Sequence, residues 1–157
     1  MIRKKILLIG DFNVGKTSLI RRYVDNAFDD SYLTTIGVKI SKKMCTINNI
    51  ECEMIIWDIE GATPTKQIPL SYYKGASGAI FVTDVNRIDT FENLVTHKER
   101  FLTANTTASF VIAHNKSDLL SKEQQKTYIL NEHTFLTSAK DDKNVEILFK
   151  TLMKKIL

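Results

Sequence analysis

The stretch Gly10-Asp11-Phe12-Asn13-Val14-Gly15-Lys16-Thr17 fits the pattern G-x-x-x-x-G-K-[ST]. It follows the apolar run at residues 6–9 and opens residues 16–24, which have a helical pattern. In such a loop, backbone N–H groups point inward at a phosphate, and the helix N-terminus adds partial positive charge. Lys16 contributes a point charge and the Thr17 hydroxyl can bind Mg²⁺. The stretch therefore predicts a strand, a phosphate-binding loop and a helix, with a nucleoside triphosphate as the ligand.

Short apolar runs alternate with longer amphipathic segments over the rest of the chain, which is typical of an α/β domain. Asn48-Asn49 separates two strand-like runs, and because asparagine tolerates positive φ, a tight antiparallel hairpin is expected there. We expect a three-layer fold with a six-stranded, mostly parallel sheet, one antiparallel edge hairpin and helices on both faces. The predicted strands are residues 6–9, 36–47, 50–58, 78–84, 109–114 and 135–137.

Helices are predicted at residues 16–24, at residues 90–104 and at the C-terminal end of the chain. The C-terminal segment has one apolar stripe at helical spacing, which should pack on the sheet. The stripe consists of Val145, Leu148, Phe149, Leu152 and Ile156. Residues 119–136 are few for a helix and its connections, so we expect a clipped fourth helix that starts in the solvated run 121–126.

Composition favours one compact domain over residues 1–157, because 43% of the residues are hydrophobic and 25% charged. The net charge is +4, but acids separate the basic clusters and no nucleic-acid motif accompanies them, so no nucleic-acid partner is expected. Cys45 and Cys52 lack metal-site spacing, which favours partly buried free thiols over a metal site or a disulfide. The apolar run near Met1 is too short for a signal peptide, so we expect a cytoplasmic protein.

Further short motifs follow other predicted strands. Asp58 ends a strand and is the expected acid for Mg²⁺, usually through a water. Gly61 lies three residues later, and its N–H can approach a terminal phosphate with no side chain in the way. Asn115-Lys116-Ser117-Asp118 ends in an aspartate that can accept two hydrogen bonds from guanine. Adenine cannot offer those donors and would leave a buried charge unpaired, so guanine is the predicted base.

Together these motifs make the chain resemble the Ras superfamily of small GTPases along nearly its whole length, and the Rab branch most closely. The resemblance rests on GDFNVGKT, Thr35-Ile36-Gly37, DIEG, NKSD and Ser138-Ala139-Lys140, reinforced by SYYKGA at 71–76 and DTFENL at 89–94. It implies the three-layer fold of a P-loop NTPase G domain. It also implies a molecular switch that binds GTP or GDP with Mg²⁺, hydrolyses GTP and signals in vesicle trafficking.

The resemblance also implies roles for particular residues. Nucleotide contacts are implied for Asn13, Gly15, Lys16, Thr17, Ser18, Phe28, Thr35, Gly61, Asn115, Lys116, Asp118, Ser138, Ala139 and Lys140. Phe28 is expected edge-on over the guanine, with plain core packing as the alternative. The implied metal ligands are Thr17, Thr35 and Asp58, and the implied catalytic residues are Lys16, Thr35 and Gly61.

The switching mechanism implied by the family is an order–disorder transition. Thr35 would bind Mg²⁺ only when the terminal phosphate is present, and hydrolysis would release switch I, at about residues 29–38, and switch II, at about residues 59–74. Both switches are expected to contact effector, exchange-factor and activating proteins. Tyr72 and Tyr73 are expected to face the effector.

Three residues depart from the family pattern. Ala62 stands where a glutamine usually orients the attacking water, and a methyl group has no donor or acceptor, so slow hydrolysis is expected. Phe12 replaces a small residue and either obstructs an incoming arginine or swings outward. Glu60 is expected to face away from the phosphate or to pair with Lys66, and the alternative is that Glu60 or Thr63 positions the water.

Two functional alternatives remain from the sequence: a slowly hydrolysing switch, and a hydrolysis-deficient GTP-bound interaction module. A small-molecule kinase is disfavoured by Asp118 and by the lack of an arginine-rich lid. No cysteine follows Cys52, so we expect no encoded lipid anchor and a location peripheral to membranes only through a partner or a tail absent here. The chain is expected to be a monomer. His97, His114 and His133 lack a paired acid in sequence and are expected to be surface or second-layer residues, rather than acids or bases.

Overall fold

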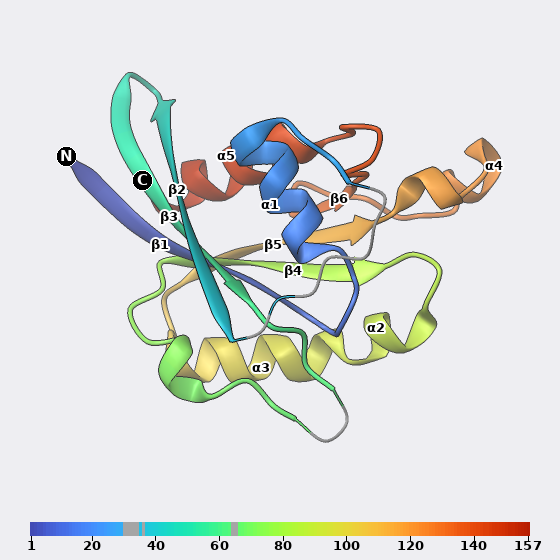
Figure 1. Ribbon diagram of the computed structural model, residues 1–157, viewed down its shortest axis with the longest axis horizontal. Coiled ribbons are helices and arrows are strands. Elements are labelled where there is room, and N and C mark those ends of the chain that lie inside the picture. Colours follow the sequence, from blue (N-terminus) through green and yellow to red (C-terminus); the bar gives the residue numbers. More distant parts are fainter. Residues whose placement is uncertain (30–34, 36, 64–65) are drawn as a thin grey trace.

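The computed structural model describes residues 1–29, 35, 37–63 and 66–157. Its strands form one sheet in the order β2-β3-β1-β4-β5-β6, in which β2 is antiparallel to β3 and the other neighbouring pairs are parallel (Figure 1). The strands are β1 (Ile2–Gly10), β2 (Val38–Ile47), β3 (Ile50–Ile59), β4 (Gly78–Asp84), β5 (Ser109–Asn115) and β6 (Thr134–Leu136). This confirms the predicted sheet, although residue 36, the expected start of the second strand, lies outside the described residues.

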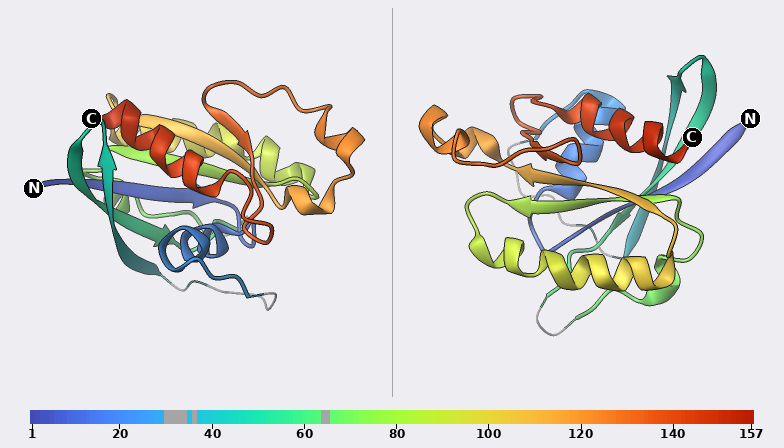
Figure 2. Two further views of the ribbon diagram at one scale, coloured as in Figure 1. Left: turned by 90° about the horizontal axis from the view of Figure 1, so that it is seen from above. Right: turned by 180° about the vertical axis from the view of Figure 1, so that it is seen from behind.

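Helices cover both faces of the sheet, as predicted. The helix α1 (Lys16–Asp25) packs with α5 (Val145–Ile156) on one face, and α2 (Ile88–Glu92) and α3 (Leu94–Ala104) lie on the other (Figures 1 and 2). The clipped fourth helix is also confirmed, because α4 (Lys122–Gln125) has only four residues. A capping box between Ser121 and Gln124 supports it by satisfying two backbone N–H groups.

The hairpin between β2 and β3 turns where the sequence predicted. Asn48 and Asn49 have φ values of 50° and 63°, the left-handed conformation that a two-residue hairpin loop requires at both positions. Cys45 and Cys52 face each other across this strand pair and are free thiols, one partly and one fully buried, as expected. Within the described ranges, none of the helices combines the length and hydrophobicity that crossing a bilayer requires.

The core lies on both sides of β1, because this strand is central and has helices above and below it. Ile6 and Leu8 belong to the cluster under α1 and α5, whereas Leu7 and Ile9 belong to the cluster under α3. All four residues are buried. Such packing fixes the end of β1, from which the phosphate-binding loop starts.

The C-terminal helix confirms the predicted apolar stripe. Val145, Leu148, Phe149 and Leu152 are buried, and Ile156 packs against the same cluster while partly exposed. The Phe149 ring stacks on Tyr23 of α1, with ring centroids 4.2 Å apart. This contact ties the helix that follows the phosphate-binding loop to the end of the chain.

Two predictions about the α3 side of the sheet were wrong. The helix predicted at residues 90–104 is interrupted at Asn93, whose side-chain amide donates to an Asp11 carboxylate oxygen at 2.8 Å. Tyr73, expected at the effector-facing surface, is fully buried in the α3 cluster and meets Phe101 edge to face at 6.0 Å, whereas Tyr72 remains partly exposed. Both differences arise from long-range contacts that the local sequence pattern does not contain.

Replacing Phe149 by alanine tests the α5 stripe. Phe149→Ala should lower the free energy of unfolding by about 3–5 kcal/mol, because it removes a fully buried ring and leaves a cavity. Urea denaturation in a single buffer measures the change. The control Ile147→Ala, on the exposed side of the same helix, should cost far less. Equal losses for the two variants would contradict the assignment of the buried face.

Candidate functional site

A cavity of about 360 Å³ opens at the carboxyl ends of the parallel strands. This edge is where open α/β sheets bind ligands. The cavity is lined by Phe12, Asn13, Gly15, Lys16, Thr17, Ser18, Phe28, Asp29, Thr35, Ile59, Gly61, Asn115, Lys116, Asp118, Leu119, Ala139 and Lys140. Residues separated by more than a hundred positions in sequence therefore share one site.

Most of the predicted site residues border this cavity, and the exceptions lie directly behind it. Asp58 and Ser138 are buried and reach the cavity only through hydrogen bonds to lining residues. Four further residues line the cavity but were not predicted as nucleotide contacts, namely Phe12, Asp29, Ile59 and Leu119. Each is next in sequence to a predicted residue, so extending every motif by one position would have found them. The roles of all these residues as ligands stay predictions.

Five consecutive carbonyls of the loop after β1 accept hydrogen bonds from side chains. The pairs are Lys16 Nζ to Gly10 O and Asp11 O (3.1 Å each), Arg87 Nη1 to Phe12 O (2.7 Å), Lys116 Nζ to Asn13 O (2.8 Å) and Asn115 Nδ2 to Val14 O (3.0 Å). In a trans peptide the N–H points opposite to the C=O of the same plane. The amides at residues 13–15 therefore turn away from these donors, as an anion cradle requires.

Gly15 ends the loop and has to be glycine for two reasons. Its φ is 102°, a conformation that other residues rarely adopt. A Cβ atom there would lie 2.3 Å from the Asn115 Nδ2 atom, which is a severe clash. Gly15 also precedes α1 without supplying a side-chain cap, so the first amides of that helix remain available to an anion.

Lys16 lies inside the loop rather than in solvent. Its ammonium is buried, and burial lowers the pKa of Lys16 to about 8, against the opposing attraction of Asp58 and Asp11. A cation that is surrounded by carbonyl oxygens and removed from water gains strongly from a nearby anion. The position and environment of Lys16 therefore suit a phosphate group.

Two hydroxyls and a carboxylate converge beside Lys16. The Thr17 and Thr35 hydroxyls donate to Asp58 Oδ2 at 2.6 and 3.0 Å, and the two hydroxyl oxygens are 2.6 Å apart. The other carboxylate oxygen, Asp58 Oδ1, is buried and has no hydrogen-bond partner among the described residues. Burial raises the pKa of Asp58. A hard cation with oxygen ligands, such as Mg²⁺, fits this group.

The opposite end of the cavity carries Asp118. The Ser138 hydroxyl donates to Asp118 Oδ1 at 2.7 Å and thereby fixes the carboxylate. Arg22 of α1 donates to the carbonyls of Ala139 and Lys140 at 2.8 and 2.9 Å, which holds the loop after β6. Phe28 lines the cavity and also packs against the core, and its contact with the base stays a prediction.

The segment after β3 confirms the predicted ion pair between Glu60 and Lys66. The Glu60 carboxylate also accepts the Gly37 N–H at 2.7 Å, and the Glu60 N–H donates to Gly37 O at 2.9 Å. The Gly37 bond and then the Lys66 bond lower the pKa of Glu60. Glu60 therefore links the end of one expected switch to the other. Residues 30–34, 36 and 64–65 of those switches lie outside the described residues.

Gly61 and Ala62 pack directly against the loop after β1. The Ala62 N–H donates to Gly10 O at 3.3 Å, and Ala62 O accepts the Phe12 N–H at 3.1 Å. A Cβ atom on Gly61 would lie 2.3 Å from Phe12 Cα, so only glycine allows this approach. The segment that carries the alanine thus lies beside the phosphate-binding loop.

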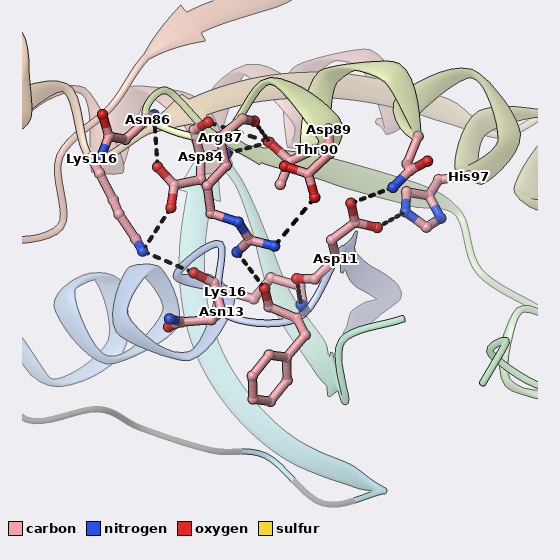
Figure 3. A network of polar contacts seen from close by, with 12 residues as sticks. Asp11, Asn13, Lys16, Asp84, Asn86, Arg87, Asp89, Thr90, His97 and Lys116 are labelled. Carbon is pink, nitrogen blue, oxygen red and sulfur yellow. Dashed lines mark hydrogen bonds and ion pairs between the residues drawn. The ribbon is translucent and has the colours of Figure 1, made fainter. Parts of the chain in front are cut away.

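Of the two positions expected for His97, surface or second layer, the structure shows the second, because His97 is buried behind the loop. Its Nε2 lies 2.7 Å from Asp11 Oδ1, and Asn93 donates to the other carboxylate oxygen of Asp11 (Figure 3). Burial acts to raise the pKa of Asp11, but the His97 and Asn93 hydrogen bonds outweigh it and hold that pKa below its ordinary value. The α3 helix thereby anchors the second residue of the loop.

His114 is partly buried near the end of β5, just before the base-site motif. Its Nδ1 lies 2.7 Å from the Thr83 hydroxyl, and its ring stacks on Phe91 at 4.7 Å. Burial lowers the pKa of His114 to about 4. His114 is therefore a neutral packing residue behind the site, in agreement with the expected second-layer role.

Comparison with known proteins finds a family model and relatives that match nearly the whole chain. The model of the Ras family matches residues 5–157. The chain is 38% identical over 168 residues to the Ras-related protein SEC4 of Saccharomyces cerevisiae, covering 97% of this chain and 74% of that protein. It is 36% identical over 162 residues to the Ras-related protein Rab-18-B of Danio rerio, covering 98% of this chain and 78% of that protein.

Because its pKa is low, His114 should lower the free energy of unfolding as the pH falls. An unfolded histidine titrates near pH 6.5, so below that pH the unfolded chain binds a proton that the folded chain does not accept until about pH 4. When the pH is lowered from 7.5 to 5, the free energy of unfolding should fall by about 2 kcal/mol more for wild type than for His114→Gln. Urea denaturation at both pH values measures this. Identical pH dependence for wild type and His114→Gln would refute it.

Proposed function

The chain belongs to the Ras family of small GTPases, in its Rab-like branch, and we propose that it is a slowly hydrolysing guanine-nucleotide switch that uses the 360 Å³ cavity. Ras-family proteins are GTPases that bind GTP and GDP, typically with Mg²⁺. The observation that carries the proposal is the continuity of this cavity. It runs from Lys16 and Thr17 in the phosphate-binding loop to Asp118 in the base-site motif.

In the proposed complex the phosphates lie on the amides of residues 13–17, and the base lies between Phe28 and Asp118. The orientation of the loop supports the first placement, because its carbonyls are held by side-chain donors. The Ser138 bond to Asp118 supports the second, because it orients a carboxylate that can accept two hydrogen bonds from guanine. Asn115, Lys116, Ala139 and Lys140 would complete the base site.

Thr17, Thr35 and Asp58 would hold the metal. The unpartnered Asp58 Oδ1 supports this assignment, because a buried carboxylate oxygen without a donor suits a cation or its bound water. When bound, Mg²⁺ supplies positive charge to the phosphate oxygens. The Lys16 ammonium adds a second charge from the protein itself, held at the centre of the loop by two carbonyls.

Hydrolysis requires a water oxygen to attack the terminal phosphorus while the bond to the bridging oxygen breaks. We propose that this step is slow, since Ala62 has no polar group to orient that water. Glu60 is a poor substitute, because Gly37 and Lys66 already engage its carboxylate. Thr63 is tied by its backbone to Lys66 in two hydrogen bonds. These contacts argue against Glu60 as the group that positions the water, and they restrict the movement of the Thr63 backbone.

Switching would proceed through Thr35 and Gly61, which border the cavity and would contact the terminal phosphate or its metal. Loss of that phosphate would release the two switch segments, at about residues 29–38 and 59–74, to different partners. Ras-family proteins generally interact with effector, exchange-factor and activating proteins. We propose the same classes of partner here, with membrane association through a partner or through a tail.

A second candidate function is a GTP-bound interaction module that does not turn over. Phe12 favours it, because this residue is 44% exposed and borders both the main cavity and a neighbouring cavity that Ala62 also lines. A ring in this place would hinder the arginine of an activating protein. The two candidates differ in one measurable quantity, the rate of GTP turnover.

Restoring the glutamine tests the proposed cause of slow turnover. Ala62→Gln should raise the single-turnover rate of GTP hydrolysis by about a hundredfold, because an oriented water lowers the barrier. Phosphate release from GTP-loaded protein measures the rate. The control Ala62→Leu adds bulk without a polar group and should stay at the wild-type rate. Brisk hydrolysis by wild type, or no gain with glutamine, would contradict the proposal.

Changing the base-reading carboxylate tests the placement of guanine. Asp118→Asn should weaken GDP binding and admit xanthosine diphosphate, because the amide presents a donor where the carboxylate accepts. Competition against a fluorescent GDP analogue gives both affinities. The exposed Asp141→Asn variant serves as the control and should keep the wild-type preference. If Asp118→Asn kept that preference too, the base assignment would be wrong.

A further inference from the structure

The connection between β4 and α2 contacts the phosphate-binding loop, although none of its residues belongs to a recognised nucleotide motif. Arg87 Nη1 donates to Phe12 O at 2.7 Å. Asp84 Oδ2 pairs at 2.9 Å with Lys116 Nζ, and the same ammonium donates to Asn13 O at 2.8 Å (Figure 3). Asp84 at the end of β4 and Arg87 in the connection that follows thus act on adjacent carbonyls of the loop, Arg87 directly and Asp84 through Lys116.

Asp84 is held firmly enough to serve as an anchor. Its side chain is only 4% exposed, and both carboxylate oxygens are engaged, Oδ1 by the Asn86 N–H at 2.9 Å and Oδ2 by Lys116. A buried carboxylate is costly unless it is paired. Movement of Lys116 would leave the buried Asp84 carboxylate without its ion-pair partner. Asp84 therefore restrains the Lys116 ammonium, which donates to Asn13 O.

Arg87 holds the neighbouring carbonyl from the same side. Its side chain is 34% exposed and lies 3.7 Å from the Asp89 carboxylate, a long contact beside its 2.7 Å bond to Phe12 O. A guanidinium is always charged and forms a stronger hydrogen bond than a neutral donor. Fixing the Phe12 and Asn13 carbonyls also fixes the N–H groups of residues 13 and 14, because each peptide plane turns as a unit.

We infer that Asp84 and Arg87 are positioning residues for phosphate binding, which hold the loop amides in their anion-facing direction and thereby prolong nucleotide residence. The inference rests on the proposed function. Among the described residues, neither of the two borders the 360 Å³ cavity. Both therefore act through Phe12, Asn13 and Lys116 and not by touching the ligand.

The test measures dissociation of a fluorescent GDP analogue from the full chain in Mg²⁺. Arg87→Gln and Asp84→Asn should each speed dissociation by about tenfold, the effect of losing one hydrogen bond to a charged group. Arg87→Lys keeps a cation within reach of Phe12 O and should restore most of the residence time. The control Asp89→Asn removes the weak partner of Arg87 and should match wild type.

A second readout separates positioning from general loosening of the fold. Competition with GDP and GMP should show that Arg87→Gln lowers the affinity for GDP but not for GMP, since GMP lacks the second phosphate that the loop amides would bind. This comparison is made on Arg87→Gln alone, because Asp84 acts through Lys116, which would also contact the base and so affect GMP.

The outcomes are distinguishable. Wild type that fails to bind the GDP analogue overturns the proposed function, and this inference with it. Wild type that binds, with Arg87→Gln and Asp89→Asn dissociating at the same rate, overturns the inference alone. Equal losses of GDP and GMP affinity also overturn it, because they would indicate a merely structural role. Selective loss of GDP affinity, rescued by Arg87→Lys, supports it.

Discussion

A loop that offers its amides to an anion must first satisfy its own carbonyls, and this constraint organises the molecule. The carbonyls of residues 10–14 all accept from side chains that arrive from α1, the β4–α2 connection and the end of β5. The strand order brings these donors together, because β1 lies next to β4 and β4 next to β5. The fold thus brings Arg87, Lys116 and the Asn115 amide, which are distant in sequence, to one short loop.

The residues that depart from the family pattern lie in this loop, as Phe12 does, or in the segment after β3 that packs beside it, as Glu60 and Ala62 do. Gly61 and Ala62 pack on the backbone near Phe12, and Glu60 joins Gly37 to Lys66. These contacts preserve the connection between the switch segments and the phosphate-binding loop while omitting the polar group that orients water. Under the proposed function, binding and switching would persist where catalysis is weak, since both would depend on backbone geometry rather than on the residue at position 62.

Local pattern in the sequence was enough to predict the strands, the asparagine turn at 48–49, the C-terminal stripe and the clipped fourth helix, because each has a periodic or turn signature within a few residues. The phosphate motif likewise predicted the residues around Lys16. The burial of Tyr73 and His97 was not predictable in this way, and neither were the contacts of Arg87. Each depends on a partner more than twenty residues away, and an isolated polar or aromatic residue looks the same in sequence whether it faces solvent or a distant loop.

The central claim, that the amides of residues 13–17 hold phosphate groups, is tested most directly by amide NMR spectra of the GMP and GDP complexes in Mg²⁺. The account predicts that adding the second phosphate shifts these amides strongly downfield, while the Phe12 amide changes little because it donates to Ala62 O. Spectra in which the amides of residues 13–17 do not respond, or in which Phe12 responds as strongly as they do, would contradict the account.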